Sequence, residues 1–194
     1  MKSIVEQRGA VSFAEFTGER VYMREFHKQS GLPGDLSRWQ STVDQMLDGV
    51  DTDGPIFLMV DQSFVKAGTP QRRPGIHIDG YWIPSLQAHR GPGGHITKLG
   101  DWGNRWDQGI RYRDEALILA SSVSACRALS GEWFGLPGEG GDCAHIDVGG
   151  LSEVRMKSGI AYAGNVAMLH ESLPVERDCF RTLVRLNVPG WSPS

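Results

Sequence analysis

Residues 160–169 read IAYAGNVAML and residues 179–188 read CFRTLVRLNV, and these two stretches decide the fold class. Both are rich in apolar and β-branched residues, and the Pro and Asp residues between them favour turns, so each is predicted to be a strand. Similar runs occur at 56–60, 115–123, 127–134 and, near the N-terminus, 21–27. Glycine makes up 25 of the 194 residues, against an average of about 7%, which is typical of folds with many tight turns. We therefore predict a mostly β chain.

One segment has helical periodicity instead. Between Leu36 and Val50 the apolar residues recur at steps of three and four, which places them on one face of a helix. Asp35 and Ser37 are both suited to cap its start, and Gly49 is suited to end it. The predicted fold class is thus mostly β with one main N-terminal helix.

Length and composition predict a single domain. A chain of 194 residues, 40% of them hydrophobic and with a net charge of −3, can bury one core. This composition excludes wholesale disorder and a strongly basic nucleic-acid binder. We expect residues 1–54 to support a core that spans about 55–190. The exception is 84–114, a glycine-rich stretch with few aliphatic residues, which predicts a long functional loop.

The sequence also predicts a cytoplasmic protein without a membrane segment. Its cysteines, Cys126, Cys143 and Cys179, form no CxxC pair and are interpreted as thiols in a reducing compartment. Charged residues at Lys2 and Glu6 leave no room for a secretory apolar segment. No apolar run reaches the ~18–20 residues of a membrane span.

The strongest chemical signal is the tripeptide HID at 77–79. On a strand, the two-residue period places His77 and Asp79 on one face, where an imidazole and a carboxylate can bind one divalent metal ion. The same tripeptide recurs at 145–147. About 0.4 such matches are expected by chance, so the motif alone assigns no site. His170, at the end of an apolar run, is the candidate for a third ligand.

Two arginines follow this histidine. Arg181 lies eleven residues after His170, and Arg185 lies four residues later on the same face of the predicted 179–188 strand. The planar guanidinium group can bind a carboxylate through two hydrogen bonds. A His-x-Asp motif, a distant histidine and a further arginine beyond it resemble the Fe(II)/2-oxoglutarate-dependent dioxygenases. That superfamily has a double-stranded β-helix core, a jelly-roll of the cupin type.

This resemblance covers about residues 55–190 and implies the composition of the site. It implies a single dioxygenase-like domain in which His77, Asp79 and His170 hold Fe(II). The iron would bind 2-oxoglutarate and O₂, with the far carboxylate of 2-oxoglutarate on Arg181. An enzyme of this kind hydroxylates a C–H bond of its substrate and releases succinate and CO₂.

The division of roles between the two arginines stays open at this point. Members of the superfamily often carry a hydroxyl two residues after the arginine, where this chain has Leu183. We expect Arg181 to bind 2-oxoglutarate, and Arg185 to face the substrate or the near end of 2-oxoglutarate. The reverse assignment is the alternative.

The strand order of the superfamily separates the two His-x-Asp motifs. Four strands lie there between the proximal and distal ligands, at roughly 8–12 residues each. The 91 residues from Asp79 to His170 can hold them, whereas the 23 residues from Asp147 cannot. We therefore interpret 145–147 as a coincidental match on a middle strand.

The composition of the predicted 84–114 loop indicates which substrates are possible. Its arginines are interleaved with Trp102 and Trp106, a composition that can stack bases and pair phosphates. The same composition is equally expected of a lid whose tryptophans pack over the mouth of the barrel. The expected partner is thus a small-molecule substrate or a nucleobase or nucleic acid, with the oligomeric state left open. His89 and His95 offer His77 a zinc site as an alternative, although their spacing is unfamiliar.

Two other function classes remain. A cupin-like metal-dependent hydrolase or isomerase would use the same three ligands without 2-oxoglutarate. A non-catalytic jelly-roll binding module would use none of them. Metal content separates the module from the enzymes, and 2-oxoglutarate binding separates the two enzymes.

Overall fold

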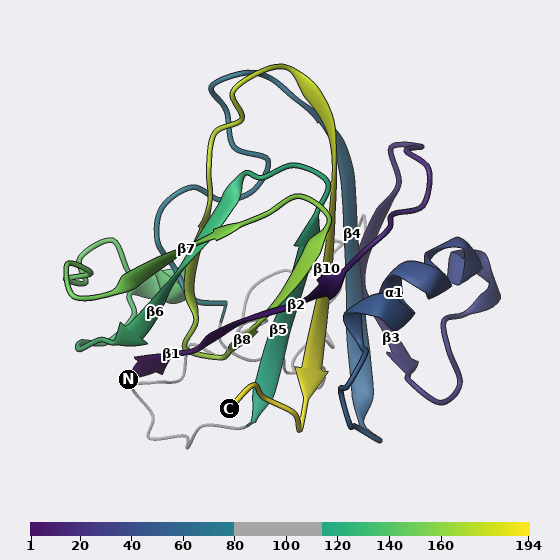
Figure 1. Cartoon of the computed structure of the whole chain (residues 1–194), viewed down its shortest axis with the longest axis horizontal. Coiled ribbons are helices and arrows are strands. Elements are labelled where there is room, and N and C mark those ends of the chain that lie inside the picture. Colours follow the sequence, from purple (N-terminus) through teal and green to yellow (C-terminus); the bar gives the residue numbers. More distant parts are fainter. Residues whose placement is uncertain (80–113) are drawn as a thin grey trace.

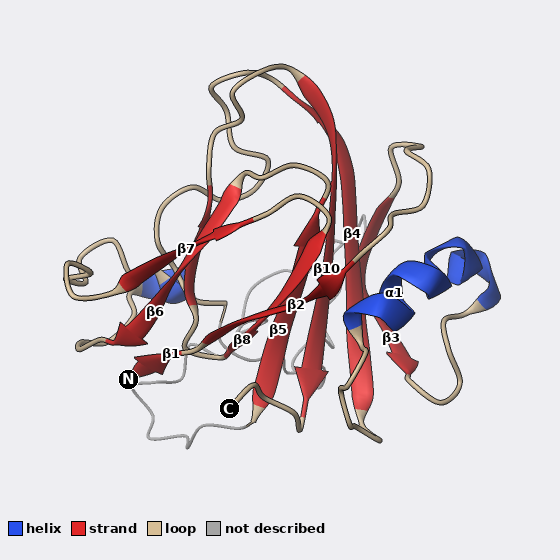
Figure 2. Cartoon of the chain, in the orientation of Figure 1, coloured by secondary structure: helices blue, strands red, loops and turns tan. Residues whose placement is uncertain are grey.

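The computed structural model describes residues 1–79 and 114–194, which form antiparallel sheets with short helical segments (Figures 1 and 2). The strands are β1 (Lys2–Ser3), β2 (Val5–Ala10), β3 (Arg20–His27), β4 (Pro55–Val65), β5 (Glu115–Ser121), β6 (Cys126–Glu132), β7 (Ser152–Met156), β8 (Ile160–Asn165), β9 (Leu169–Ser172) and β10 (Cys179–Pro189). The helical segments are the 3-10 helices η1 (Gly34–Trp39) and η4 (Glu139–Gly141) and the α-helix α1 (Gln40–Met46). For the described residues, the prediction of a mostly β fold with one N-terminal α-helix is confirmed.

The described strands form two sheets. The larger has the order β2-β8-β5-β10-β4-β3, and the smaller joins β1, β6 and β7, with β9 also paired to β6. The chain moves between the sheets several times, since β5, β8 and β10 belong to the larger sheet and β6, β7 and β9 to the smaller one. In Figure 1 the two sheets face each other across the body of the molecule. Consequently β9 and β10, which carry the candidate histidine and arginines, lie in different sheets.

Side-chain alternation along β10 decides what lies between the sheets. Val184 and Leu186 are buried in the core cluster that includes Trp39 of η1, so one face of the larger sheet is covered by the helical segment. Because successive strand residues point to opposite faces, Arg181 and its alternate neighbours point toward the smaller sheet. Arg181 accordingly contacts Ser172 of β9. The two-residue period therefore buries arginines between the sheets.

The helical segment differs from the predicted 36–50 helix in extent and capping. It begins as a 3-10 helix, and α1 ends at Met46. Neither helical segment has a side-chain hydrogen bond that caps its N-terminus. Asp35, one of the expected caps, instead pairs with Arg24 at an N–O distance of 3.3 Å. Gly49 has a φ of 67°, and this left-handed residue turns the chain after the helix has ended. The apolar face itself is buried against the larger sheet as the periodicity predicts.

Two of the expected strands differ markedly in extent from the structure. The 160–169 run is two strands, because a turn forms in which the Met168 N–H donates to the Asn165 carbonyl at 2.9 Å. Strand β4 continues from the predicted 56–60 to Val65. Its extension is stabilised by the Gln62 side chain, which accepts hydrogen bonds from backbone N–H groups of the segment preceding β3.

The predicted loop at 84–114 lies outside the described residues, apart from Asp114. The proposals for Trp102 and Trp106, and the alternative ligands His89 and His95, lie outside them as well. Within the described part of the chain, no helix has the length and apolar character that a membrane span requires.

Candidate metal centre

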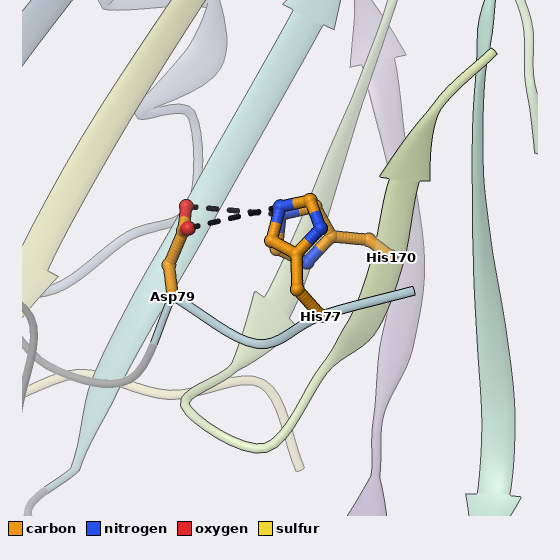
Figure 3. A group of neighbouring side chains, drawn as sticks. All are labelled: His77, Asp79 and His170. Carbon is orange, nitrogen blue, oxygen red and sulfur yellow. Dashed lines mark ion pairs between the residues drawn. The ribbon is translucent and has the colours of Figure 1, made fainter. Parts of the chain in front are cut away.

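Three side chains from two distant parts of the sequence converge between the sheets. His77 and Asp79 lie on the segment after β4, His170 lies on β9, and one ligand atom of each lies within 4.8 Å of the others (Figure 3). The Asp79 carboxylate oxygens lie 3.9 Å from Nε2 of His77 and 3.7 Å from Nε2 of His170. The two histidines are 7% and 9% exposed, so their side chains are largely shielded from bulk water.

The 77–79 segment forms only isolated β-bridges, so the strand expected there is shorter than predicted. His77 bridges to His170 on one side and to Asp142 on the other. The side chains still alternate: Ile78 is buried in a separate apolar cluster with Leu169, while its two neighbours face His170. The two-residue period inferred from the sequence is therefore correct, although the strand is not.

Each imidazole is oriented by a backbone carbonyl. Nδ1 of His77 lies 2.7 Å from the Gly75 carbonyl, and Nδ1 of His170 lies 3.0 Å from the Met168 carbonyl. Because a carbonyl only accepts, Nδ1 carries the proton in each neutral ring and Nε2 keeps its lone pair. Both lone pairs are then available on the side that faces Asp79, which is the arrangement expected of metal-binding histidines.

Asp79 is held ionised by its surroundings. Burial alone would raise its pKa, but the Arg185 guanidinium, which donates from Nη1 to Oδ2 at 2.8 Å, and the two imidazoles hold the pKa well below its usual range. Burial, with a smaller contribution from His170, lowers the pKa of His77 to about 3. At neutral pH the site therefore offers one carboxylate and a neutral His77, the protonation states that bind a metal cation.

The geometry and donor set fit a divalent transition metal. Ligand bonds of about 2.1 Å place neighbouring ligand atoms roughly 3.0–3.4 Å apart around one ion. The two distances from Asp79 to the histidines, 3.9 and 3.7 Å, exceed this range by roughly 0.3–0.9 Å. The side chains would move together by about this much on binding an ion. Two imidazoles and one carboxylate on one side of an ion, with the remaining positions open, form the donor set of non-haem Fe(II) oxygenases.

A cavity of about 180 Å³ adjoins the three ligands. Its walls combine the ligands and Arg185 with apolar side chains from the larger sheet, including Met59, Leu119 and Leu183. Arg185 thus lies at the candidate metal centre, where its ion pair with Asp79 is 2.8 Å long.

Arg181 lies further from the ligands, fully buried. Nε donates to the Ser121 hydroxyl at 3.0 Å, Nη1 to the Ser172 hydroxyl at 3.4 Å, and Nη2 to the Cys126 sulfur at 3.0 Å. Burial raises the pKa of the Cys126 thiol, so this partner is neutral. Among the described side chains, Arg181 has no carboxylate partner. Ser172 and Cys126 also line the cavity, so this buried cation lies directly behind that part of the cavity wall.

A glycine turn that the sequence analysis missed supports the ligand segment. The Ile78 N–H donates to the Gly141 carbonyl at 3.0 Å. Gly141 has a φ of 79°, and a Cβ there would lie 2.1 Å from the Ile78 carbonyl oxygen. Only glycine allows this approach. Glycine is frequent throughout this chain, so no local sequence signal distinguishes this position.

The second HID motif plays no part in this cluster. Its residues 145–147 lie in a turn rather than on the predicted middle strand, since the short 3-10 segment and turns occupy the chain between β6 and β7. His145 is exposed and its Nε2 contacts the Leu136 carbonyl at 3.0 Å, while Asp147 accepts from the Gly149 N–H at 2.9 Å.

Compared with protein-family models, curated proteins and solved structures, the chain has no significant match.

Proposed function

We propose that this chain is an Fe(II)- and 2-oxoglutarate-dependent oxygenase with a double-stranded β-helix core. The strand order supports the fold. The larger sheet contains four consecutive neighbours in the order β4, β10, β5 and β8. The smaller sheet likewise contains four neighbours in the order 77–79 segment, β9, β6 and β7. Four described strands, β5 to β8, separate Asp79 from His170, as the superfamily's order requires.

One observation carries the cofactor assignment: Arg181, fully buried and without a carboxylate partner among the described residues, lies directly behind Ser172 and Cys126, which line the metal-site cavity. A buried cation is costly unless it is paired. Arg181 contacts two hydroxyls and a thiol, and none of them carries charge. We propose that the distal carboxylate of 2-oxoglutarate supplies the missing negative charge.

The spacing of β9 suits this ligand. Ser172, which contacts Arg181, lies two residues after His170 on β9, and two strand residues span roughly 6.6–6.8 Å. A five-carbon dicarboxylate has the reach to extend from a metal ion at His170 to a guanidinium beside Ser172. The hydroxyls of Ser121 and Ser172 compensate for the hydroxyl that the superfamily often carries where this chain has Leu183.

Each protein group has a distinct task in this proposal. His77, Asp79 and His170 hold the iron, which supplies the O₂ chemistry when bound. Arg185 keeps Asp79 ionised and limits the movement of its carboxylate. Arg181 fixes the far end of 2-oxoglutarate, and the apolar walls at Met59 and Leu119 exclude water from the reacting groups. The substrate C–H bond is hydroxylated while 2-oxoglutarate is converted to succinate and CO₂.

The test is succinate formation from 2-oxoglutarate by the iron-loaded protein, measured with and without ascorbate and without added substrate. Slow uncoupled turnover that requires Fe(II) and fails in H170A supports the proposal. Iron binding without any 2-oxoglutarate binding or turnover would favour the hydrolase or isomerase alternative.

A further inference from the structure

The carboxylates around the cavity are already matched by arginines. Asp79 pairs with Arg185 at 2.8 Å. Glu171, which also lines the cavity, accepts from Nε of Arg127 at 2.6 Å. These two pairs leave no carboxylate in the described lining to neutralise a further cation.

Two further arginines, Arg72 and Arg73, are exposed and line the same cavity, so they mark its opening to solvent. Arg72 has a partner, because its Nη1 lies 3.2 Å from Oδ2 of Asp61. Arg73 contacts only a neutral group among the described residues: its Nη1 donates to the Gly140 carbonyl at 2.7 Å. Within residues 1–79 and 114–194, no carboxylate therefore pairs with Arg73 at the entrance.

The position of Arg73 is fixed by the same turn that supports the metal ligands. Gly140 and Gly141 have φ values of 66° and 79°, and the turn bonds both Arg73 and Ile78. One edge of the guanidinium group is thus anchored to the turn, and its remaining N–H groups have no hydrogen-bond partner in the described part of the chain. An anchored arginine loses less entropy on binding an oxyanion than a mobile one.

Aromatic and apolar side chains also line the described part of the cavity. Tyr22, 51% exposed, lines the cavity from β3. It lies where the pairing of β3 with β4 shifts register between Val21 and Arg24, next to Met23, whose φ is 46°. Irregularities of this kind re-aim side chains and are frequent beside functional sites. With Met59 and Leu183, Tyr22 gives the cavity a surface suited to an apolar or aromatic body.

From this juxtaposition we infer that the substrate is an organic oxyanion, a phosphate or a carboxylate on an apolar or aromatic body, and that Arg73 binds its charged group at the entrance. The inference deepens the proposed function, on which its assignment as substrate rests. Arg73 is then a specificity-determining residue that directs the uncharged part of the substrate toward the metal centre.

The experiment measures binding of phenyl phosphate, benzoate and the neutral benzyl alcohol by calorimetry. It compares the unmodified protein with R73Q and with R155Q, a control that removes an exposed arginine of β7 paired with Glu153. Each titration is run on metal-free protein and on protein loaded with Mn(II) and 2-oxoglutarate. In the loaded samples, paramagnetic relaxation of the probe's ring protons locates the probe near the metal.

We expect one of the two anions to bind and benzyl alcohol to bind much more weakly. R73Q should weaken the anion about tenfold, since a hydrogen bond to a charged group is lost, and R155Q should leave affinity unchanged. A preference for phenyl phosphate or for benzoate identifies the oxyanion. Equal affinity of R73Q and the unmodified protein, or equal binding of benzyl alcohol, overturns the inference. Failure to bind metal or 2-oxoglutarate overturns the proposed function instead, and the metal-free titration still decides the role of Arg73.

Discussion

His77 and His170 exchange two backbone hydrogen bonds, each with an N–O distance of 3.0 Å, and their ring centroids lie 4.5 Å apart. The separation of the two imidazoles is therefore set by main-chain pairing between the ligand segment and β9. Their Nδ1 atoms are fixed by carbonyl groups of Gly75 and Met168. The two candidate ligands are thus oriented by the protein's own backbone, which would reduce the entropy that metal binding must offset.

We expect the two identical tripeptides to behave differently on mutation. H77A and H170A each remove one of three ligands and should reduce bound iron from one equivalent to a small fraction of it. H145A removes an exposed turn residue and should leave iron stoichiometry unchanged. Metal analysis at matched folded fraction, checked by circular dichroism, makes the comparison. Iron loss in H145A with retention in H77A would contradict the ligand assignment.

Substitutions of Arg181 and Arg185 should affect 2-oxoglutarate binding and metal binding differently. R181A removes the proposed partner of the distal carboxylate and should weaken 2-oxoglutarate by about 2–5 kcal/mol with little effect on iron. R185A leaves Asp79 without its guanidinium and should chiefly weaken iron. Titrations of both ligands into both variants test this. A larger 2-oxoglutarate defect in R185A would reverse the two roles.

Acid should destabilise the metal-free protein. The pKa of His77 is about 3 in the folded chain against an ordinary value of about 6.5, so the unfolded state binds more protons between these values. The free energy of unfolding should therefore fall as the pH drops below about 6.5, by up to roughly 1.4 kcal/mol per pH unit. Asp79, whose pKa is depressed, adds to the loss below about pH 4, where unfolded carboxylates protonate.

Urea unfolding across this pH range measures the effect. H77Q removes the titrating group and should flatten the dependence between about pH 6.5 and 4. H145Q alters an exposed histidine and should retain the slope. An identical slope in H77Q and the unmodified protein would show that His77 is not the group responsible.

The glycine turn offers a test of how the ligand segment is supported. G141A places a Cβ 2.1 Å from the Ile78 carbonyl oxygen, so the segment must move and iron affinity should fall with stability. G68A is a matched control, since Gly68 has a φ of 76° with nothing within 4 Å of its Cβ position. It should cost about 1 kcal/mol of backbone strain and leave iron binding intact. Equal iron affinity in the two variants would contradict the supporting role.

That His77, Asp79 and His170 lie together could be predicted, because each part has a local pattern and the resemblance supplied their pairing. The period of two at 77–79 and the apolar run that ends at His170 both appear in the sequence, and the structure brings these residues together. Strand β7, by contrast, was not predictable in this way: its sequence SEVRM is largely exposed and lacks clear alternation.

The environment of Arg181 could not be predicted, because its partners come from three different strands. Ser121, Cys126 and Ser172 lie 60, 55 and 9 residues away along the chain. Hydroxyls and thiols are common in strands, so no spacing identifies them in advance. The ion pair of Arg185 with Asp79 joins residues 106 positions apart, so no local sequence pattern predicts it either.

The most direct measurement of the central claim is anaerobic titration of the Fe(II)-loaded protein with 2-oxoglutarate, followed by visible absorption. Chelation of Fe(II) by the 2-oxo acid should produce a saturable charge-transfer band with one equivalent of ligand. The band should need much more 2-oxoglutarate in R181A and should be unchanged in H145A. Saturable iron binding with no band at any 2-oxoglutarate concentration would contradict the account.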